Sequence, residues 1–408
     1  MSIYSSSILS NGLRIVHLPS ESPVSYCGLA INAGTRDEQP HQSGLAHFVE
    51  HMLFKGTEKR KSWHIFNRME NVGGELNAYT TKEETFLYAI SLLDDTKRAV
   101  ELLADLAFHS QFPESEIDKE REVVIDEIHS YEDNPSEALC DEFENILFEG
   151  SPMGHLILGN EADLRTFTSD TCRTFANTFY HPENMVFFYY GKMPWTKITR
   201  LAEKYLGETR PNKGIPNQRE KPEPVETVRE KRNKNLHQSH VMLGSRGYGL
   251  HDDKRIGLFL LNNLLGGPGM NSRLNIALRE KRGLVYSVDS TVTSYSDTGV
   301  FSIYFGCDHE SVRQCLRLTY KELQKLRNNS LTSSQLHAAV KQLKGQMGIS
   351  GDHRENMALA LGKSFLHYNR YDSLPETYKK LDALTAGQLL EIANEVFDES
   401  RLFSLIFE

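Results

Sequence analysis

The sequence has no excess of basic residues, and this absence excludes a class of protein. Its 408 residues include 46 Lys and Arg against 55 Asp and Glu, a formal net charge of −9. Nucleic-acid-binding proteins neutralise phosphates with a basic surface, so we expect no nucleic-acid partner. An acidic protein instead attracts peptides that carry basic segments. Hydrophobic residues at 39% and charged residues at 25% are typical of a globular chain.

Cysteines and long apolar runs are also scarce. The cysteines are odd in number and widely spaced, at Cys27, Cys140, Cys172, Cys307 and Cys315. Without a C-x-x-C pair they indicate neither a disulfide framework nor a thiolate metal site. No apolar run approaches the ~20 residues of a membrane helix, and the Ser-rich start lacks the basic and apolar parts of a secretory leader. We therefore expect a bacterial-type, reducing cytoplasm and no membrane association.

The chain contains two copies of one pattern. Leu164–Gly191 and Leu381–Glu408 have equal lengths, and each reads as a helix followed by a strand. His47–Gly56 corresponds in the same way to Leu258–Gly267, where the histidines and the glutamate are replaced by Leu and Asn. A repeat of this length indicates a duplicated domain rather than a solenoid.

The duplication and a change in composition predict the domain boundaries. Residues 210–235 are rich in Pro, Lys, Glu and Asn and contain few large apolar residues, which is typical of a linker. We expect a catalytic domain at 1–210, a linker at 211–235 and a homologous domain at 236–408.

Residues 47–51, H-F-V-E-H, form a candidate metal-binding motif. On a helix, His47 and His51 lie one turn apart on the same face, with the carboxylate of Glu50 beside them. The order H-x-x-E-H inverts the commoner H-E-x-x-H and occurs in zinc hydrolases. We expect this helix to begin near Ser43, a plausible N-cap.

A catalytic zinc needs three protein ligands and one position open to water. With His47 and His51 as two, we expect the third on the helix that follows Pro113. The candidates on that helix are Glu120, Glu122, Asp126, Glu127 and His129. Glu120 and Glu127 lie about two turns apart and share a face, so one can bind the metal while the other orients a histidine. Spacing alone does not choose between the candidates, and a solvated acidic face would also explain the helix.

A family resemblance extends this interpretation. Residues 43–57, SGLAHFVEHMLFKGT, resemble the active-site segment of the pitrilysin, insulysin and mitochondrial processing peptidase family. Further similarity lies at 73–80, 179–185 and 278–286, so the resemblance covers nearly the whole chain. It implies an α+β fold of two homologous domains of the metalloenzyme LuxS/processing-peptidase type. Each domain should be an antiparallel-rich sheet packed by helices on one face.

The resemblance also implies roles for the acidic residues. The family's third zinc ligand matches Glu127, so one zinc ion per chain would be held by His47, His51 and Glu127. A second family glutamate matches Glu120, which joins the catalytic group. Glu50 would act as the general base that takes a proton from the attacking water.

Two further sets of residues follow from the resemblance alone. The family stabilises the developing oxyanion with an Arg and a Tyr that match Arg279 and Tyr286; by residue type alone, Arg279 would be a surface charge and Tyr286 a core residue. Substrate in the family adds as a strand near a segment that matches Asn77, Ala78 and Tyr79. By residue type alone, Asn77 would be a turn residue.

The function implied is a zinc-dependent endopeptidase that hydrolyses peptides or unfolded segments in an enclosed chamber. The family's working unit contains four such domains, and this chain has two. We therefore expect a homodimer in which the partner chain completes the active site. The alternatives are a non-catalytic scaffold or partner subunit of the same fold and, after that, a zinc protein without protease activity.

Overall fold

The structure, a computed structural model, describes residues 3–207 and 219–408. The chain divides into two compact units, and each is assembled from three segments. The first unit comprises Met1–His129, His155–Glu220 and Ser350–Ser373. The second unit comprises Ser130–Gly154, Lys221–Ile349 and Leu374–Glu408.

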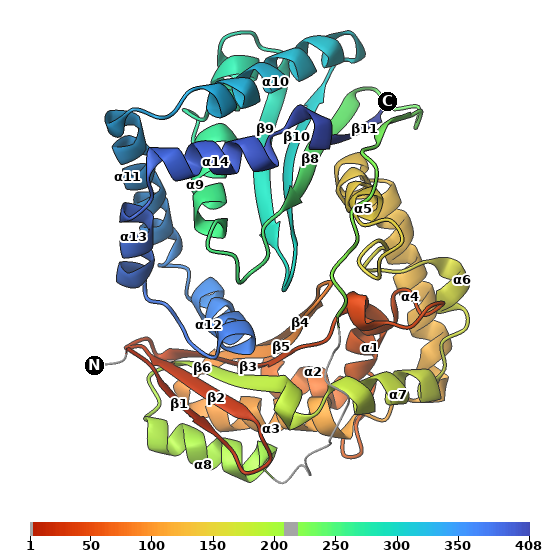
Figure 1. Cartoon of the computed structure of the whole chain (residues 1–408). Helices are drawn as coiled ribbons and strands as arrows, with labels where there is room; N and C mark the ends of the chain where they lie inside the picture. Colours follow the sequence, from red (N-terminus) through yellow and green to blue (C-terminus); the bar gives the residue numbers. More distant parts are fainter. Residues whose placement is uncertain (1–2, 208–218) are drawn as a thin grey trace. The chain divides into compact units, whose positions relative to one another are not determined.

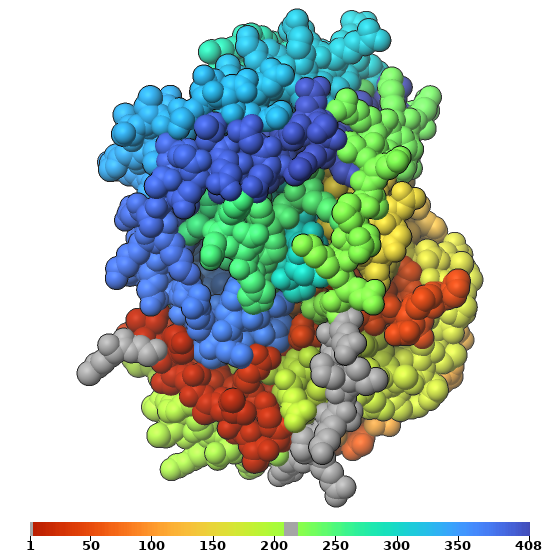
Figure 2. Space-filling model, in the orientation of Figure 1, coloured from red at the N-terminus to blue at the C-terminus, as the bar shows by residue number. Residues whose placement is uncertain are grey.

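The first unit contains a six-stranded sheet with the order β1-β2-β6-β3-β5-β4 (Figure 1). Its strands are β1 (Ser5–Ile8), β2 (Arg14–Pro19), β3 (Val24–Ile31), β4 (Glu75–Thr80), β5 (Thr85–Leu92) and β6 (Met185–Gly191). The pair β2–β6 is parallel and the other neighbours are antiparallel. The turn between β1 and β2 contains Asn11-Gly12, a dipeptide typical of hairpins, and Gly12 has the positive φ of 90° that such a turn requires. The outer strand β1 is largely exposed, and its hairpin belongs to the red surface in Figure 2.

The second unit repeats this topology without a counterpart of β1 among the described residues. Its five-stranded sheet has the order β7-β11-β8-β10-β9. The strands are β7 (Arg229–Arg232), β8 (Ser239–Gly247), β9 (Val285–Ser294), β10 (Gly299–Cys307) and β11 (Phe403–Phe407). The pair β7–β11 is parallel, as β2–β6 is in the first sheet, and the remaining neighbours are antiparallel. The α+β class and the duplication read from the sequence are confirmed.

The helices also correspond between the two units. Those of the first unit are α1 (Leu45–Leu53), α2 (Ser62–Glu70), α3 (Thr96–His109), α4 (Glu114–Glu132, of which the last three residues belong to the second unit), α6 (Glu161–Leu164), α7 (Ser169–Phe179), α8 (Trp195–Leu206) and α12 (Arg354–Tyr368). Those of the second are α5 (Pro135–Leu147), α9 (Arg255–Gly266), α10 (Val312–Asn328), α11 (Ser333–Ser350), α13 (Leu374–Asp382) and α14 (Ala386–Val396), with a π-helical turn at Asn275–Glu280. Thr168 and Thr385, matched in the repeat, both form N-terminal capping boxes, of α7 and α14.

Each sheet is covered on both faces, not on one as the sequence predicted. Most helices pack on one face, but the other face of the first sheet is covered by α12, from the second half of the chain. The second sheet is covered in the same way by α5, from the first half. The strands explain this, because β6 is apolar almost throughout (MVFFYYG) and buries side chains on both of its faces.

The boundaries of the two compact units therefore reflect packing. The domain boundaries predicted at residues 210 and 236 instead reflect the duplication in the sequence. The segment that carries α5 lies in the first half of the sequence but belongs to the second unit. The segment that carries α12 lies in the second half but belongs to the first unit. The linker expected at 211–235 lies partly outside the described residues, and its described part contains β7. Among the residues that the structure describes, no helix has the length and apolar character needed to cross a bilayer.

Two glycines in helices give a test of how tightly α12 packs. Alanine in place of a helical glycine normally stabilises by up to ~1 kcal/mol. A Cβ atom at Gly362 of α12, however, would lie 2.6 Å from a ring carbon of Phe188, which is fully buried in β6. We expect Gly362→Ala to lower the midpoint of thermal unfolding. Gly345→Ala in α11, where a Cβ meets no atom within 4 Å, should leave it unchanged or raise it. Equal effects of the two substitutions would contradict this packing.

Candidate metal centre

The motif at 47–51 lies within α1, whose residues are almost all buried. The helix begins one residue later than predicted, because Gly44 rather than Ser43 is the N-cap. Gly44 has φ 93°, and a Cβ atom there would lie 2.5 Å from the carbonyl oxygen of Leu158. Only glycine fits this conformation and this close approach without strain.

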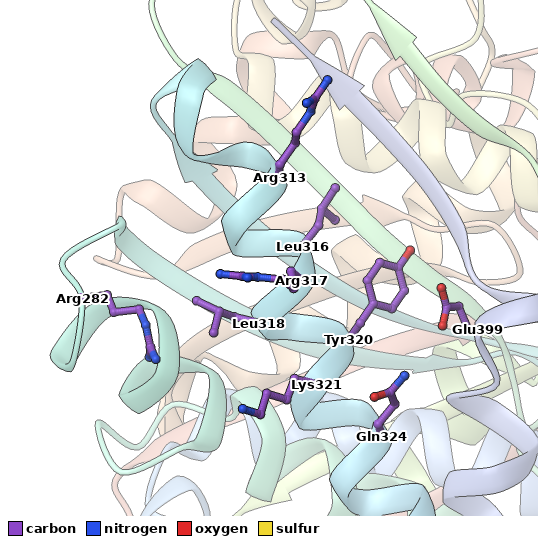
Figure 3. A pocket seen from close by; sticks show the side chains of 9 residues that line it. All are labelled: Arg282, Arg313, Leu316, Arg317, Leu318, Tyr320, Lys321, Gln324 and Glu399. Carbon is purple, nitrogen blue, oxygen red and sulfur yellow. The ribbon is translucent and has the colours of Figure 1, made fainter.

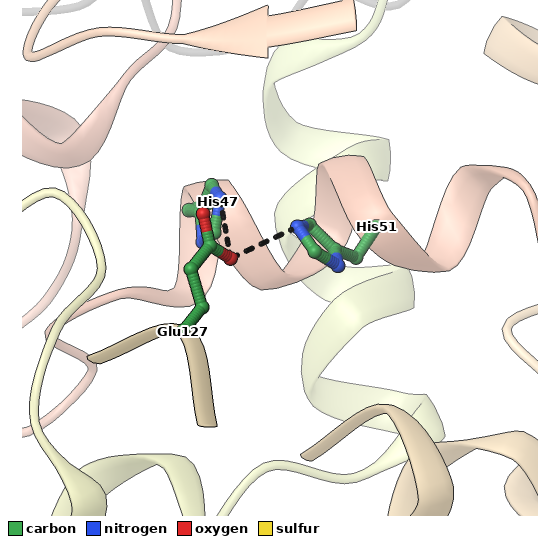
Figure 4. A group of neighbouring side chains, drawn as sticks. All are labelled: His47, His51 and Glu127. Carbon is green, nitrogen blue, oxygen red and sulfur yellow. Dashed lines mark ion pairs between the residues drawn. The ribbon is translucent and has the colours of Figure 1, made fainter. Parts of the chain in front are cut away.

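Glu127 of α4 faces both histidines of α1 (Figure 4). Its Oε2 atom lies 3.8 Å from Nε2 of His47 and 3.6 Å from Nε2 of His51. In the described part of the chain, these three residues form the one group of His, Cys, Asp or Glu that could hold a metal ion, with its ligand atoms within 4.8 Å of one another. Of the five candidates on α4, Glu127 is the one in this group.

The spacing of these atoms fits a small divalent cation. Ligand atoms at ~2.1 Å from a tetrahedral zinc ion lie roughly 3.4 Å apart, close to the separations of Glu127 from the two imidazoles. The Glu127 side chain is 34% exposed and that of His51 is 22% exposed, so the group remains open to solvent on one side. A fourth, exchangeable position is what a catalytic site requires.

Glu120 orients His51 from behind. Its Oε1 atom lies 2.9 Å from Nδ1 of His51, and its Oε2 atom lies 2.5 Å from the ammonium of Lys55. Hydrogen bonding to Nδ1 directs the proton to that nitrogen and leaves the Nε2 lone pair facing Glu127. The position of Glu120 near the histidines was predicted from the sequence, whereas that of Lys55, four residues after His51, was not.

Glu50 is the third functional side chain of α1 and is 8% exposed. The hydroxyl of Thr80, at the end of β4, donates a hydrogen bond of 2.6 Å to its Oε2. Thr80 therefore fixes one carboxylate oxygen and leaves Oε1 for another partner. Nothing in the local sequence indicated Thr80, because strand pairing and sheet packing bring β4 to α1.

Burial and neighbouring charges shift the pKa values of these groups in different directions. Burial, followed by the nearby charge of His51, lowers the pKa of His47 to about 3, so this imidazole is neutral near pH 7. Burial also acts to lower the pKa of His51, but the hydrogen bond that His51 donates to Glu120 and the charges of the surrounding carboxylates outweigh it and raise this pKa. Burial raises the pKa of Glu50, against the hydrogen bond from Thr80. Two imidazoles among several carboxylates make a negative site that favours a cation.

The other residues predicted for the site lie on separate elements. Asn77, Ala78 and Tyr79 belong to β4, which is one of the two edge strands of its sheet. Arg279 and Tyr286 belong to the second unit, where the guanidinium of Arg279 lies 5.8 Å from the ring centroid of Tyr286. Tyr286 is 88% exposed, so residue type alone would have placed it wrongly in the core.

Two cavities lie in the second unit and contain none of these residues. The larger, of about 800 Å³, is lined by Arg282, Arg313, Leu316, Arg317, Leu318, Tyr320, Lys321, Gln324 and Glu399 (Figure 3). The smaller, of about 360 Å³, is lined by Tyr131, Ser136, Glu137, Cys140, Asp141, Met242, Asp289, Thr291, Ser302 and Tyr304. Neither of these two cavities therefore contains the candidate metal centre.

Two family models match the chain. Residues 14–161 match "Insulinase (Peptidase family M16)", and residues 166–343 match "Peptidase M16 inactive domain". The fold is shared by a solved structure from Pseudomonas fluorescens described as a peptidase M16 inactive domain. Its TM-score is 0.92 at 20% identity, and the match covers 99% of this chain and 97% of that one.

Curated relatives match over nearly the whole chain. The zinc protease YmxG of Bacillus subtilis, described as uncharacterized, is 34% identical over 97% of this chain and 96% of its own length. The beta subunit of the bovine mitochondrial-processing peptidase is 32% identical over 96% of this chain and 82% of its own length. The chain therefore belongs to peptidase family M16, as a half-length, zinc protease-like member.

Proposed function

We propose that the chain is a zinc-dependent endopeptidase that hydrolyses peptides or unfolded segments in an enclosed chamber. The observation that carries this proposal is the grouping of His47, His51 and Glu127 around one point, with the carboxylate of Glu50 on the same helix. The names of the relatives, which include zinc proteases and a processing peptidase, support the same function.

The two imidazoles and the Glu127 carboxylate would hold one zinc ion. When bound, zinc supplies a Lewis acid that polarises a peptide carbonyl and lowers the pKa of water. Glu120, tied to Lys55, would keep His51 in the tautomer whose Nε2 binds the metal.

Glu50 would transfer the proton during hydrolysis. Its free Oε1 would take a proton from water as the water oxygen attacks the carbonyl carbon, and it would pass that proton to the amide nitrogen as the C–N bond breaks. Burial of Glu50 and the hydrogen bond from Thr80 fix its orientation. The substrate would add as a strand beside Asn77, Ala78 and Tyr79, an arrangement that the edge position of β4 supports.

Arg279 and Tyr286 would stabilise the oxyanion for the zinc site of a second copy. The exposure of Tyr286 and the position of Arg279 beside its ring support a role as donors. A homodimer would give the family's four domains, and the name of the bovine relative, a subunit, is consistent with assembly. The bacterial-type cytoplasmic location stays a prediction.

A non-catalytic subunit is the second candidate, and the description "inactive domain" for residues 166–343 favours it for that part of the chain. The metal ligands and Glu50 are all present in the other part, which favours the peptidase. A zinc protein without protease activity is the third candidate. Zinc affinity and peptide cleavage, measured on the same chain, distinguish the three candidate functions.

The ligand set predicts one zinc ion per chain. Glu127→Gln should weaken zinc binding by more than the roughly 10–100-fold typical of a residue that supports a ligand. The matched control is Glu122→Gln on the same helix, whose side chain is 63% exposed and pairs with Arg165. Competition with a chromophoric chelator measures both affinities. Equal affinities of the two variants would exclude Glu127 as a ligand.

Glu50→Gln should retain zinc but lose about 10²–10⁴-fold in cleavage rate, the usual contribution of a general base. The assay is digestion of a mixed peptide library, with and without a chelator, read by mass spectrometry. Internal cleavage by the unmutated chain that the chelator abolishes is expected. A zinc-loaded chain without such cleavage would be a non-catalytic subunit or a metal-only protein.

Mixing two inactive variants tests the shared site. Glu50→Gln lacks the base and Arg279→Ala lacks the oxyanion donor, so a mixed dimer contains one site with both residues intact. We expect activity to return after the two chains are unfolded together and refolded. If the mixture stays as inactive as each variant alone, the active site is not completed by a second copy.

A further inference from the structure

The first turn of α1 has no cap from its own N-cap residue. Gly44 occupies that position and has no side chain to accept a hydrogen bond. The first N–H groups of a helix have no partner within the helix, and when buried they need an acceptor from elsewhere. Leu45 and Ala46, the first two residues of α1, are fully or almost fully buried, so water does not fill this role.

The N–H of Leu45 donates to the backbone oxygen of Gln42 at 3.0 Å. The acceptor for the N–H groups of Gly44 and Ala46 is the carboxylate of Glu38, six residues before Gly44. Its Oε2 atom accepts from the N–H of Gly44 at 3.0 Å, and its Oε1 atom accepts from the N–H of Ala46 at 2.7 Å. The Glu38 side chain is 1% exposed. It comes from the polar segment that joins β3 to α1, which the sequence shows only as a turn. The negative charge also complements the positive end of the helix dipole.

His155 holds this carboxylate from its other side. Its Nε2 atom lies 2.9 Å from Oε2 of Glu38, and its backbone oxygen accepts a hydrogen bond from the buried ammonium of Lys82. Burial raises the pKa of Glu38 to about 7, and the hydrogen bonds from His155 and the two N–H groups act against that rise. Each carboxylate oxygen of Glu38 thus accepts a hydrogen bond from a backbone N–H at the start of α1, and His155 is a further partner.

The capped turn is the one that carries His47. His47 is the third residue of α1 and directly follows Ala46, whereas His51 lies one turn further on and is held separately by Glu120. The Nδ1 atom of His47 has no hydrogen-bond partner among the described residues, so no side chain orients this imidazole from behind. Its position depends on the backbone of the first turn.

We propose that Glu38 is a positioning residue for the metal centre, which caps the first turn of α1 and thereby fixes the imidazole of His47 relative to His51. The role in zinc binding rests on the proposed function, whereas the capping of α1 does not. His155 acts through Glu38 by keeping its carboxylate aligned with the two N–H groups. Glu38 thus holds the backbone that carries His47, whereas Glu120 holds the ring of His51.

The test compares Glu38→Ala and Glu38→Gln with the unmutated chain. In the metal-free protein, hydrogen exchange at the amides of Gly44 and Ala46 should become about tenfold faster in Glu38→Ala, since a cap is lost. Zinc affinity, measured by chelator competition, should fall by about 10–100-fold. Glu38→Gln keeps the shape and one acceptor, so both effects should be smaller, and it remains informative if Glu38→Ala does not fold.

Asp163→Ala is the matched control. Asp163 is another carboxylate at this helix start, but it accepts from the N–H of Ser43, outside α1, so this variant should keep the zinc affinity of the unmutated chain. Unchanged exchange at Ala46 in both Glu38 variants would overturn the cap. Faster exchange with unchanged zinc affinity would overturn the positioning role. If the unmutated chain binds no zinc, the proposed function fails, and the exchange rates alone decide whether Glu38 caps α1.

Discussion

The candidate site depends on one constraint: two imidazoles must stay adjacent and fixed on a helix that is almost wholly buried. Burial keeps His47 neutral, because a charged imidazole in this position would lose its hydration. The same burial restricts movement of the α1 backbone, because α1 packs against α7 and β4. Apart from Glu50, the carboxylates around the two imidazoles lie outside the helix and approach it from other elements. The helix holds the two imidazoles in place, and carboxylates on neighbouring elements add negative charge around them.

The polar groups around α1 form two layers with different tasks. Glu127 faces the point where the imidazoles converge and stays partly exposed. Glu120, Lys55, Thr80 and Glu38 lie behind the groups that face this point, and each bonds to a side chain or N–H group of α1 or to another member of this layer. Such outer contacts set orientation and tautomer. Because Glu120 and Glu38 are buried, loss of a partner of either residue leaves a buried polar group unsatisfied.

Much of the fold was predictable from the sequence, because its signals are local. The helix that carries residues 47–51 and the order of helix then strand in Leu164–Gly191 and Leu381–Glu408 follow from short-range patterns. The two histidines were also local. The choice of Glu127 came from a family resemblance, and its place in the group could not be derived from spacing. The start of α1 was misplaced by one residue, because the close approach of Leu158 that requires Gly44 is a tertiary contact.

Sequence patterns could not predict that α5 packs in the second unit and α12 in the first. By amphipathicity alone, either helix could cover either sheet. It has a consequence for how the chain is made. During synthesis the first sheet is complete once β6 ends at Gly191, but its second apolar face has no cover until α12, which ends at Tyr368, has emerged. For much of translation that face is exposed to other chains and to chaperones. The first unit therefore cannot complete its packing until the second half of the chain has been synthesised.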